Sequence, residues 1–405
     1  MTGFDGNSPL LLPPRKSNSR LPSWTMRAAP QVPQASLTAI EEYFVERNVN
    51  LGGPYRHSQQ NIAFLDEIRA SLAAFLGASS SDEIFFGLNA TSLMRLLATS
   101  LREIFSPGDE IIISGLEHEA NVTPWLRFQQ DGVKIHFWNP RGPEALLQFG
   151  DLKALLSERT RLVAVCGASN LLGTVNDLRP IADLVHEHGA ILFVDGVHYA
   201  PHRHTDVRRD DIDVFVCSGY KIFGAHIGLA ACKRRLLEHL PGLNHYFLKD
   251  KLKFELGTQN FEGLAATGGV LSYFAGLAKE LGIGGEIPYG KVFERIDAYE
   301  KVLSERLIGG LQALEGVRVY GITDPARFDM RTPTAAFTVE DHAPLEVATL
   351  LGKAGFGVNE GDLYAARIVD WLGLREGGGV VRASLCHYNT IEEIDGLLEA
   401  IKSIG

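Results

Sequence analysis

Cysteine is scarce in this chain of 405 residues, which has four, and none of the four stands at a metal-binding or redox spacing. Cys166, Cys217 and Cys232 end the apolar runs "LVAVC", "VFVC" and "GLAAC", as small buried hydrophobic residues do. Free thiols of this kind fit a reducing compartment better than a disulfide framework. We therefore expect a cytoplasmic protein.

Long apolar runs and long basic runs are missing as well. No apolar run approaches the length needed to cross a bilayer, and the N-terminus lacks the basic-then-apolar order of a signal peptide. A formal net charge of -10 without a Lys/Arg run argues against nucleic-acid binding. We expect neither a membrane nor a nucleic-acid partner, and we expect residues 1–30, rich in Pro, Ser and Asn, to form a loose arm.

What the chain does contain is an alternation of short β-rich runs and amphipathic segments. The runs "EIFFGL", "DEIIISGL", "VKIHFW", "TRLVAVCGAS" and "AILFVDGV" are separated by segments with helical spacing. This alternation predicts an α/β fold with a mostly parallel sheet covered on both faces. Two further strands, "DVFVCSG" and "HIGLAACK", stand so close together that one of them is a candidate for an antiparallel strand.

The last third of the chain predicts a second, smaller domain. A long helical region at about 261–314 precedes strand-like "VRVYGI", "TAAFTV" and "GVVRASL" and a closing helix. We expect a large domain at 31–275, whose N-terminal helix packs on the small domain, and a small α+β domain at 276–405.

Ligands bind at the carboxyl ends of the strands in open α/β sheets, so the loops after the strands matter most. Asp195 directly follows "AILFV", His118 follows "IIISGLE", and Lys221 follows a later strand end. Thr91 and Ser92 of "NATS" open a helix and suit a phosphate. Each signal has a plain alternative, such as a turn residue, an N-cap or a surface loop. Together they supply a phosphate cradle, a carboxylate, an aromatic ring and an amine.

The motifs around these residues resemble those of the class V aminotransferase and cysteine desulfurase-like family of fold type I pyridoxal phosphate (PLP) enzymes. The resemblance rests on "SNLLGTVNDL", "FVDGVHYAPH", "SGYKIFG" and "VRASLCHYNTIEEID" and runs from about Val32 to the C-terminal helix. It implies a mostly parallel seven-stranded sheet sandwiched by helices, a smaller C-terminal α+β domain, PLP as cofactor and an amino-acid substrate. It also implies a homodimer with a shared active site.

The resemblance assigns roles to three of the strand-end residues. Lys221 matches the lysine that forms a Schiff base with PLP and moves protons, for which a desolvated amine with a lowered pKa is suited. Asp195 matches the aspartate that faces the pyridine nitrogen and keeps it protonated. His118 matches the residue that stacks over the ring. These three are the predicted catalytic residues.

The remaining predicted cofactor contacts also come from the resemblance. Asn170 and His198 match positions near the phenolic oxygen of the cofactor. The phosphate site is matched by Ala90, Thr91 and Ser218, and Thr258 of "FELGTQN" would reach the phosphate in the partner subunit. Tyr220, directly before the lysine, is either a cofactor contact or a packing residue.

Arg382 of "VRASL" matches the arginine that binds the substrate α-carboxylate through two parallel hydrogen bonds. The loop "NLGGPYRHSQQ" either lines the substrate mouth with Tyr55 and His57 or is an ordinary polar loop. A metal site in "HYAPHRH" is not expected, because His198 is assigned to the cofactor and strand geometry would scatter the other histidines.

One departure from the resemblance bears on the reaction. Cysteine desulfurases use a mobile-loop cysteine to take up sulfur, whereas the corresponding "VNEGDLYAARI" has Tyr364, a candidate substrate contact. Cys386, the next cysteine along the chain, is expected in the "RASL" strand. We therefore predict a PLP-dependent transferase or lyase without the loop persulfide cysteine. A PLP lyase or a carbon–carbon bond-forming enzyme of secondary metabolism, of decarboxylative aldol or Mannich type, is the alternative. A true cysteine desulfurase or a non-catalytic PLP-fold protein is a weaker one.

Overall fold

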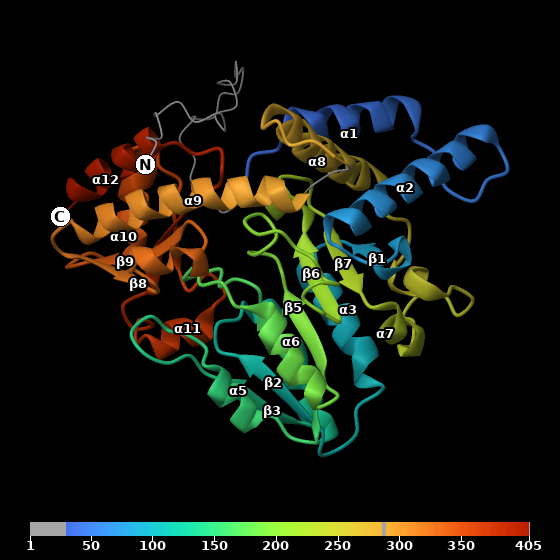
Figure 1. The fold of residues 1–405 in the computed structure, drawn as a ribbon, viewed down its shortest axis with the longest axis horizontal. Coiled ribbons are helices and arrows are strands. Elements are labelled where there is room, and N and C mark those ends of the chain that lie inside the picture. The colour runs from blue at the N-terminus through green and yellow to red at the C-terminus, as the bar shows by residue number, and fades with distance from the viewer. Residues whose placement is uncertain (1–29, 286–288, 405) are drawn as a thin grey trace.

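A seven-stranded sheet forms the centre of the computed structural model, which describes residues 30–285 and 289–404 (Figure 1). The predicted arm, apart from Pro30, lies outside the described residues. The strand order is β1-β7-β6-β5-β4-β2-β3. In chain order the strands are β1 (Ile84–Gly87), β2 (Glu110–Ser114), β3 (Lys134–Trp138), β4 (Thr160–Cys166), β5 (Ile191–Asp195), β6 (Val214–Ser218) and β7 (Gly228–Cys232).

The strand directions confirm the predicted mostly parallel sheet. Strands β3, β2, β4, β5 and β6 run parallel to one another, and β7 runs antiparallel to both β6 and β1. Only residues 219–227 separate β6 from β7, which is too short for the crossover that a parallel pair requires. The prediction that one of these two closely spaced strands runs antiparallel is therefore confirmed, and the antiparallel strand is β7.

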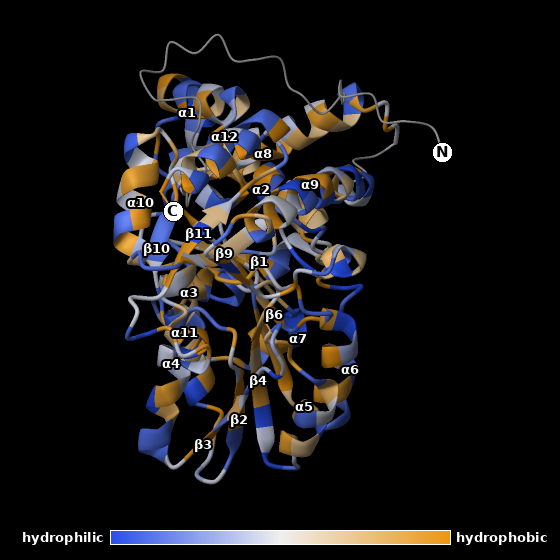
Figure 2. Ribbon diagram, turned by 90° about the vertical axis from the view of Figure 1, so that its left-hand side faces the viewer, coloured by the Kyte–Doolittle hydropathy of each residue, from blue (hydrophilic) through white to orange (hydrophobic). Residues whose placement is uncertain are grey.

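Both faces of the sheet are buried, which explains why its strands read as continuous apolar runs. In β4, Val163 and Val165 belong to one core cluster, and Leu162 and Ala164 belong to the cluster on the opposite face. The first cluster includes residues of α2 (Arg56–Phe75), α5 (Phe149–Leu155), α6 (Leu178–Glu187) and α8 (Phe261–Glu280). The second includes residues of α3 (Ala90–Arg102), α4 (Thr123–Leu126) and α7 (Arg234–His239). Figure 2 shows α5 and α6 with both hydrophilic and hydrophobic residues, as expected of helices that cover a sheet with one side.

A four-stranded antiparallel sheet of order β10-β11-β9-β8 lies in the C-terminal part of the chain. Its strands are β8 (Val317–Tyr320), β9 (Thr334–Val339), β10 (Asn359–Gly361) and β11 (Val380–Ser384), accompanied by α10 (Pro344–Lys353), α11 (Ala366–Trp371) and α12 (Ile391–Lys402). Helix α9 (Tyr289–Gln312) connects the two parts: Val292 and Ile296 lie in the first core of the large sheet, and Leu303 and Leu307 lie in a separate C-terminal core. The predicted domain boundary at 275/276 falls inside α8 and stays a prediction.

The position of the N-terminal helix differs from the expectation that it packs on the small domain. Helix α1 (Gln34–Glu46) lies along α8 instead (Figure 1). The two helices approach closely because α8 has a glycine at the contact: a Cβ at Gly269 would lie 2.5 Å from the Cα of Ser36. The Ser36 hydroxyl donates a hydrogen bond to the carbonyl of Ala266 at 2.9 Å, which fixes the pair. The preceding Gln31 reaches the C-terminal part, where its N–H donates to the Tyr388 hydroxyl at 3.0 Å.

No helix within residues 30–285 and 289–404 has both the length and the apolar character that a membrane crossing requires.

The α1–α8 contact generates a stability prediction. Gly269→Ala should destabilise the protein by about 1–3 kcal/mol, because the new methyl group overlaps the α1 backbone, which cannot give way as a flexible side chain would. Gly276→Ala on the same helix is the matched control: no atom lies within 4 Å of its added Cβ, so it should stabilise by about 1 kcal/mol through helix propensity. Chemical denaturation monitored by circular dichroism measures both, and equal effects would contradict the packing argument.

Candidate active site

The predicted site residues gather where the parallel strands of the large sheet end. His118 follows β2, Asn170 follows β4, Asp195 ends β5 and Lys221 follows β6. Because these strands run parallel, their carboxyl ends share one edge of the sheet. The small sheet contributes Arg382 from β11.

Lys221 is held in a short 3-10 turn, Gly219–Ile222, between β6 and β7. The turn is compact: a Cβ at Gly219 would lie 2.6 Å from Ile227, and Phe223 closes the turn at a φ of 73°. The amine is largely buried, and its pKa is lowered to about 8, first by burial and then by the positive charge of Arg382. The amine of Lys221 is therefore shielded by the protein rather than a fully solvated surface charge.

Asp195 is only 4% exposed, and burial raises the pKa of its carboxyl group to about 6. Two interactions oppose that rise: the N–H of Val197 donates to the carboxylate at 2.9 Å, and the positive charge of Lys221 favours the ionised form. The two predicted catalytic groups, the carboxyl of Asp195 and the amine of Lys221, are thus electrostatically coupled.

His118 begins the 3-10 turn Glu119–Asn121 and is neutral. Burial, followed by the charges of Lys221 and Arg382, lowers its pKa to about 4. Its Nδ1 accepts a hydrogen bond from the N–H of Ala120 at 3.0 Å, so the ring has a fixed orientation. The ring centre lies 5.4 Å from that of Tyr364, which is 70% exposed at the mouth of the site. Tyr364 is therefore beside the site and accessible.

The predicted phosphate site lies at the N-terminus of α3. The N–H of Ala90 donates to the Ser218 hydroxyl at 3.4 Å, which joins this helix end to the end of β6. Thr91 is exposed there, whereas the Ser92 hydroxyl is already used in a capping box with Asn89. The "NATS" motif suggested the hydroxyls of Thr91 and Ser92 for binding a phosphate. Because Ser92 is used in the helix cap, the Thr91 hydroxyl is the one that can bind a phosphate.

Arg382 and Asn170 meet on the small-domain side of the site. A guanidinium nitrogen of Arg382 donates to the backbone carbonyl of Asn170 at 2.7 Å, and the Asn170 amide donates to the carbonyl of Leu363 at 2.9 Å. Among the described residues, two buried atoms here have no hydrogen-bond partner, the Arg382 Nε and the Asn170 Oδ1. Buried polar groups without partners are places where a ligand can complete the hydrogen bonds.

The model of the aminotransferase class-V family matches residues 25–397 of this chain. The chain belongs to this family. It is 37% identical over 385 residues to the aminotransferase-like protein FGM3 of Gibberella zeae, covering 92% of this chain and 91% of that protein. It is 35% identical over 348 residues to the nonribosomal peptide synthetase-like enzyme fsqF of Aspergillus fumigatus, covering 83% of this chain and 22% of that enzyme.

The fold is also found among solved structures. The apo structure of a cysteine desulfurase from Thermococcus onnurineus NA1 superposes with a TM-score of 0.84 at 26% sequence identity, covering 93% of this chain and 92% of that chain. The chain is therefore a PLP-dependent enzyme, a transferase or lyase, with the predicted fold of the class V aminotransferases and cysteine desulfurases. The residues at its strand ends fit that cofactor, since they include a buried amine, a buried carboxyl group and two buried polar atoms without partners.

Two other predicted contacts of the class V site have protein partners. His198 is buried, and its Nε2 lies 3.2 Å from the Thr332 hydroxyl and 3.1 Å from the Thr334 hydroxyl. Tyr220 stacks on His226, with ring centres 4.8 Å apart, and the Lys221 Nζ lies 5.2 Å from the centre of the Tyr220 ring. The contacts of Tyr220 thus include both packing and the lysine.

Three further predicted residues, Tyr55, His57 and Thr258, are exposed in a single copy of the chain. Their predicted roles, contacts at the substrate mouth for Tyr55 and His57 and a contact to the partner subunit's phosphate site for Thr258, stay predictions.

Sequence reasoning missed two groups that lie close to the site. Glu117, next to His118 in "EHEAN", has a fully buried side chain coupled to Asp195. Cys386 was expected in the "RASL" strand, but β11 ends at Ser384, and the thiol lies close enough to Lys221 to affect its pKa. The sequence could have pointed to Glu117, because this carboxylate stands directly before His118, a predicted cofactor contact. Nothing comparable in the sequence pointed to Cys386.

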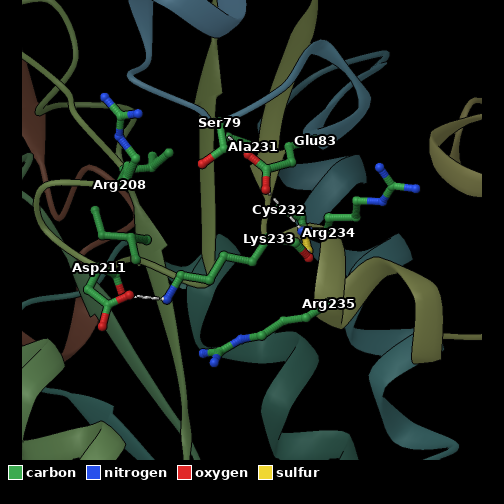
Figure 3. A pocket seen from close by; sticks show the side chains of 11 residues that line it. Ser79, Glu83, Arg208, Asp211, Ala231, Cys232, Lys233, Arg234 and Arg235 are labelled. Carbon is green, nitrogen blue, oxygen red and sulfur yellow. Dashed lines mark hydrogen bonds and ion pairs between the residues drawn. The ribbon is translucent and has the colours of Figure 1, made fainter.

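A cavity of about 300 Å³ lies at the opposite end of the sheet (Figure 3). One of its lining residues, Cys232, pairs with Val214, where β6 begins. The predicted site lies beyond Ser218, where β6 ends. Charged side chains that line it are engaged with protein groups in two places: Figure 3 shows the Lys233 ammonium directed at Asp211, and Glu83 accepts from the backbone of Arg234. The cavity is therefore separate from the strand-end site.

The coupling between the two cationic groups generates a second prediction. Arg382→Gln should raise the pKa of Lys221 above about 8, by roughly one unit, because the guanidinium is the charge that most opposes the protonated amine. The pH dependence of amine acylation at Lys221, quantified by peptide mass spectrometry, measures this pKa. Arg375→Gln is the control, because that guanidinium pairs with Asp370 and does not act on Lys221. A Lys221 pKa that stays at about 8 in Arg382→Gln would contradict the assignment.

Proposed function

We propose that this PLP-dependent enzyme acts on an amino acid, with Lys221 as its acid–base group and Arg382 as the group that binds the substrate carboxylate. The observation that carries the proposal is the buried Lys221 amine with a pKa of about 8, placed between the charges of Arg382 and Asp195. At pH 7 about one such amine in ten is neutral, against roughly one in three thousand for a lysine of pKa 10.5. A neutral amine is needed to bind the cofactor and to accept a proton.

The other residues of the site have roles that follow from their chemistry. PLP, when bound, supplies a ring that accepts electrons from a bond broken at the substrate α-carbon. Asp195 would face the ring nitrogen, and its carboxylate would keep that nitrogen protonated. His118, neutral and fixed by Ala120, would lie over the ring without adding charge. Lys221 would then take and return the proton at the α-carbon.

We further propose that the enzyme does not relay sulfur through a persulfide. Tyr364, which lies beside His118 and is exposed, belongs to the segment that the resemblance matches to the cysteine-bearing loop of the desulfurases. Cys386, the thiol near Lys221, is a poor substitute, because burial raises its pKa and so removes the reactive thiolate. Catalytic release of sulfide from cysteine would contradict this proposal.

The alternative is a lyase or a carbon–carbon bond-forming reaction, of decarboxylative aldol or Mannich type. The similarity to a nonribosomal peptide synthetase-like enzyme of a fungus supports a role in secondary metabolism. These reactions begin with the same residues and differ in which bond at the α-carbon is broken. Incubation with single amino acids, with and without a 2-oxo acid as amino acceptor, followed by mass identification of the products, separates them. Acceptor-dependent formation of the 2-oxo acid that keeps the whole side chain indicates transamination, and loss of a side-chain group or of carbon dioxide without the acceptor indicates the alternative.

The attachment of the cofactor gives the direct test of the proposed function. Borohydride reduction of the wild-type enzyme should fix PLP covalently to the peptide that contains Lys221, and Lys221→Ala should lose this adduct while retaining the fold. Peptide mass spectrometry locates the adduct, and circular dichroism controls for folding. An adduct that persists on another lysine would refute the role of Lys221.

We also propose that the enzyme is a homodimer whose two sites each use residues of both copies. Exposed apolar side chains support it: Leu88, which follows β1, and Tyr246, Phe247 and Leu256 are 77%, 99%, 63% and 51% exposed. Thr258 follows Leu256 closely in the chain and is itself exposed. Exposed large apolar and aromatic residues are typical of protein interfaces.

Mixed dimers test the shared site. Lys221→Ala and Thr258→Asp should each abolish the spectral response of the bound cofactor to amino acids, the second by repelling the phosphate. Mixing the two unfolded variants and refolding them together should restore the response in part, because one site of each mixed dimer then has both native residues. If Thr258 acts within its own chain, or not at all, mixing restores nothing beyond the separate variants. Sedimentation analysis confirms that mixed dimers form.

A further inference from the structure

Glu117 is a buried carboxyl group that the proposed reaction does not use. Its side chain is fully inaccessible and precedes His118 in the loop after β2. It accepts three hydrogen bonds, from the Ser114 hydroxyl, from the Asn121 amide at 2.7 Å and from the N–H of Cys166 at 2.5 Å. All three donors are uncharged, and within the described part of the chain Glu117 has no ion pair. A carboxylate buried without a cation is costly unless it takes up a proton.

The first link between Glu117 and the proposed active site passes through β4. Cys166, whose N–H donates to Glu117, is the neighbour of Asp195 across the parallel strands. The next residue, Gly167, donates its N–H to the backbone carbonyl of Asp195 at 2.8 Å. Glu117 therefore contacts the end of β4, which is paired with the end of β5 that holds Asp195.

The second link passes through α4. Asn121, which donates to Glu117, accepts a hydrogen bond from the Trp125 indole at 3.0 Å. The indole packs edge-on against Phe193 of β5, with ring centres 5.0 Å apart. Glu117 is thus joined to the strand of Asp195 at two separate points, and its own neighbour His118 is one of the predicted cofactor contacts.

The charges around Glu117 determine which form it takes. From β5 it faces Asp195, and burial together with the negative charge of Asp195 raises the pKa of Glu117 to about 7. From β4 it faces Cys166, whose thiol stays neutral because its pKa is raised, and from its own loop it adjoins His118, whose lowered pKa keeps the ring neutral. The nearby cation Lys221 acts on Asp195. Two like charges in one buried region favour protonation of the member without a cation.

We propose that Glu117 is a positioning residue that holds the loop of His118 against the ends of β4 and β5 and ionises only after Asp195, so that the first negative charge of this region resides on Asp195. This inference rests on the proposed function, in which Asp195 faces the cofactor ring. It assigns Glu117 no contact with substrate or cofactor. Its neutral form leaves Asp195 as the only anion that the ring nitrogen meets.

The proton on Glu117 can be observed directly in full-length purified protein. Infrared difference spectra between pH 6 and pH 8, with the glutamate side-chain carboxyls labelled with ¹³C, should show the loss of one protonated-carboxyl band. The label moves glutamate bands away from those of aspartate, so Asp195 does not contribute. Glu117→Gln should lack this band, and Glu119→Gln, which removes a carboxylate from the same loop, should retain it.

The stability of the protein gives a second readout with a defined sign. The folded-state pKa of Glu117 is raised from 4.5 to about 7, so the folded protein binds the extra proton between these values. Stability therefore falls as the pH rises through this range, and the loss is complete above about pH 7. Between pH 6 and pH 8 the melting temperature should fall less in Glu117→Gln, which resembles the protonated form, than in the wild type or in Glu119→Gln.

Three outcomes would overturn the proposal. The wild type could lack the band at pH 6, or the band could persist in Glu117→Gln, or the pH dependence of the melting temperature could be the same in both. Should Glu117→Gln fail to fold, Ser114→Ala replaces it: loss of this donor should move the midpoint of the band to higher pH, and an unchanged midpoint also overturns the proposal. Because neither readout requires turnover, a wrong reaction assignment leaves both results interpretable.

Discussion

Burial of charge at one edge of the large sheet is the constraint on which the rest of the structure depends. Lys221, Asp195 and Arg382 are all largely removed from solvent, and burial is the first cause of the shifted pKa of each. Taking such groups out of water costs several kcal/mol apiece unless neighbouring charges and hydrogen bonds offset it. Parallel strands covered on both faces provide a rigid frame that can meet this cost, because each strand end holds its loop at a fixed distance from the next.

Most of the fold could be predicted from the sequence, because doubly buried strands leave continuous apolar runs and helices leave a periodic pattern. The seven-stranded sheet, its antiparallel strand and the smaller C-terminal part followed in this way. The position of α1 did not, since it depends on a close backbone approach at Gly269, and a glycine within a helix has several possible meanings. The short β10 (Asn359–Gly361) was missed for a related reason: three polar or small residues carry no strand pattern, and only pairing with β11 makes them a strand.

The positions of Asp195, the last residue of β5, and of Lys221, three residues after β6, could be predicted, because strand ends define the edge at which ligands bind. Glu117 was not recognised, since a sequence does not reveal that a carboxylate beside a loop histidine is sealed from water. Tyr55, His57 and Thr258 represent another limit. They are exposed in a single copy of the chain, and the contact predicted for Thr258 depends on a second copy, while those predicted for Tyr55 and His57 depend on a bound substrate.

Helix α9 has a mechanical consequence for the enzyme. Its 24 residues form one uninterrupted helix, about 36 Å long, with one end packed in the core of the large sheet and the other in the C-terminal core. Glu300 near its middle is buried against His202, so the helix is also pinned between its two ends. An unbroken helix does not bend sharply without losing backbone hydrogen bonds. Arg382 on the small sheet and Lys221 beside the large sheet therefore belong to two parts joined by one stiff helix, which limits how far the distance between them can change.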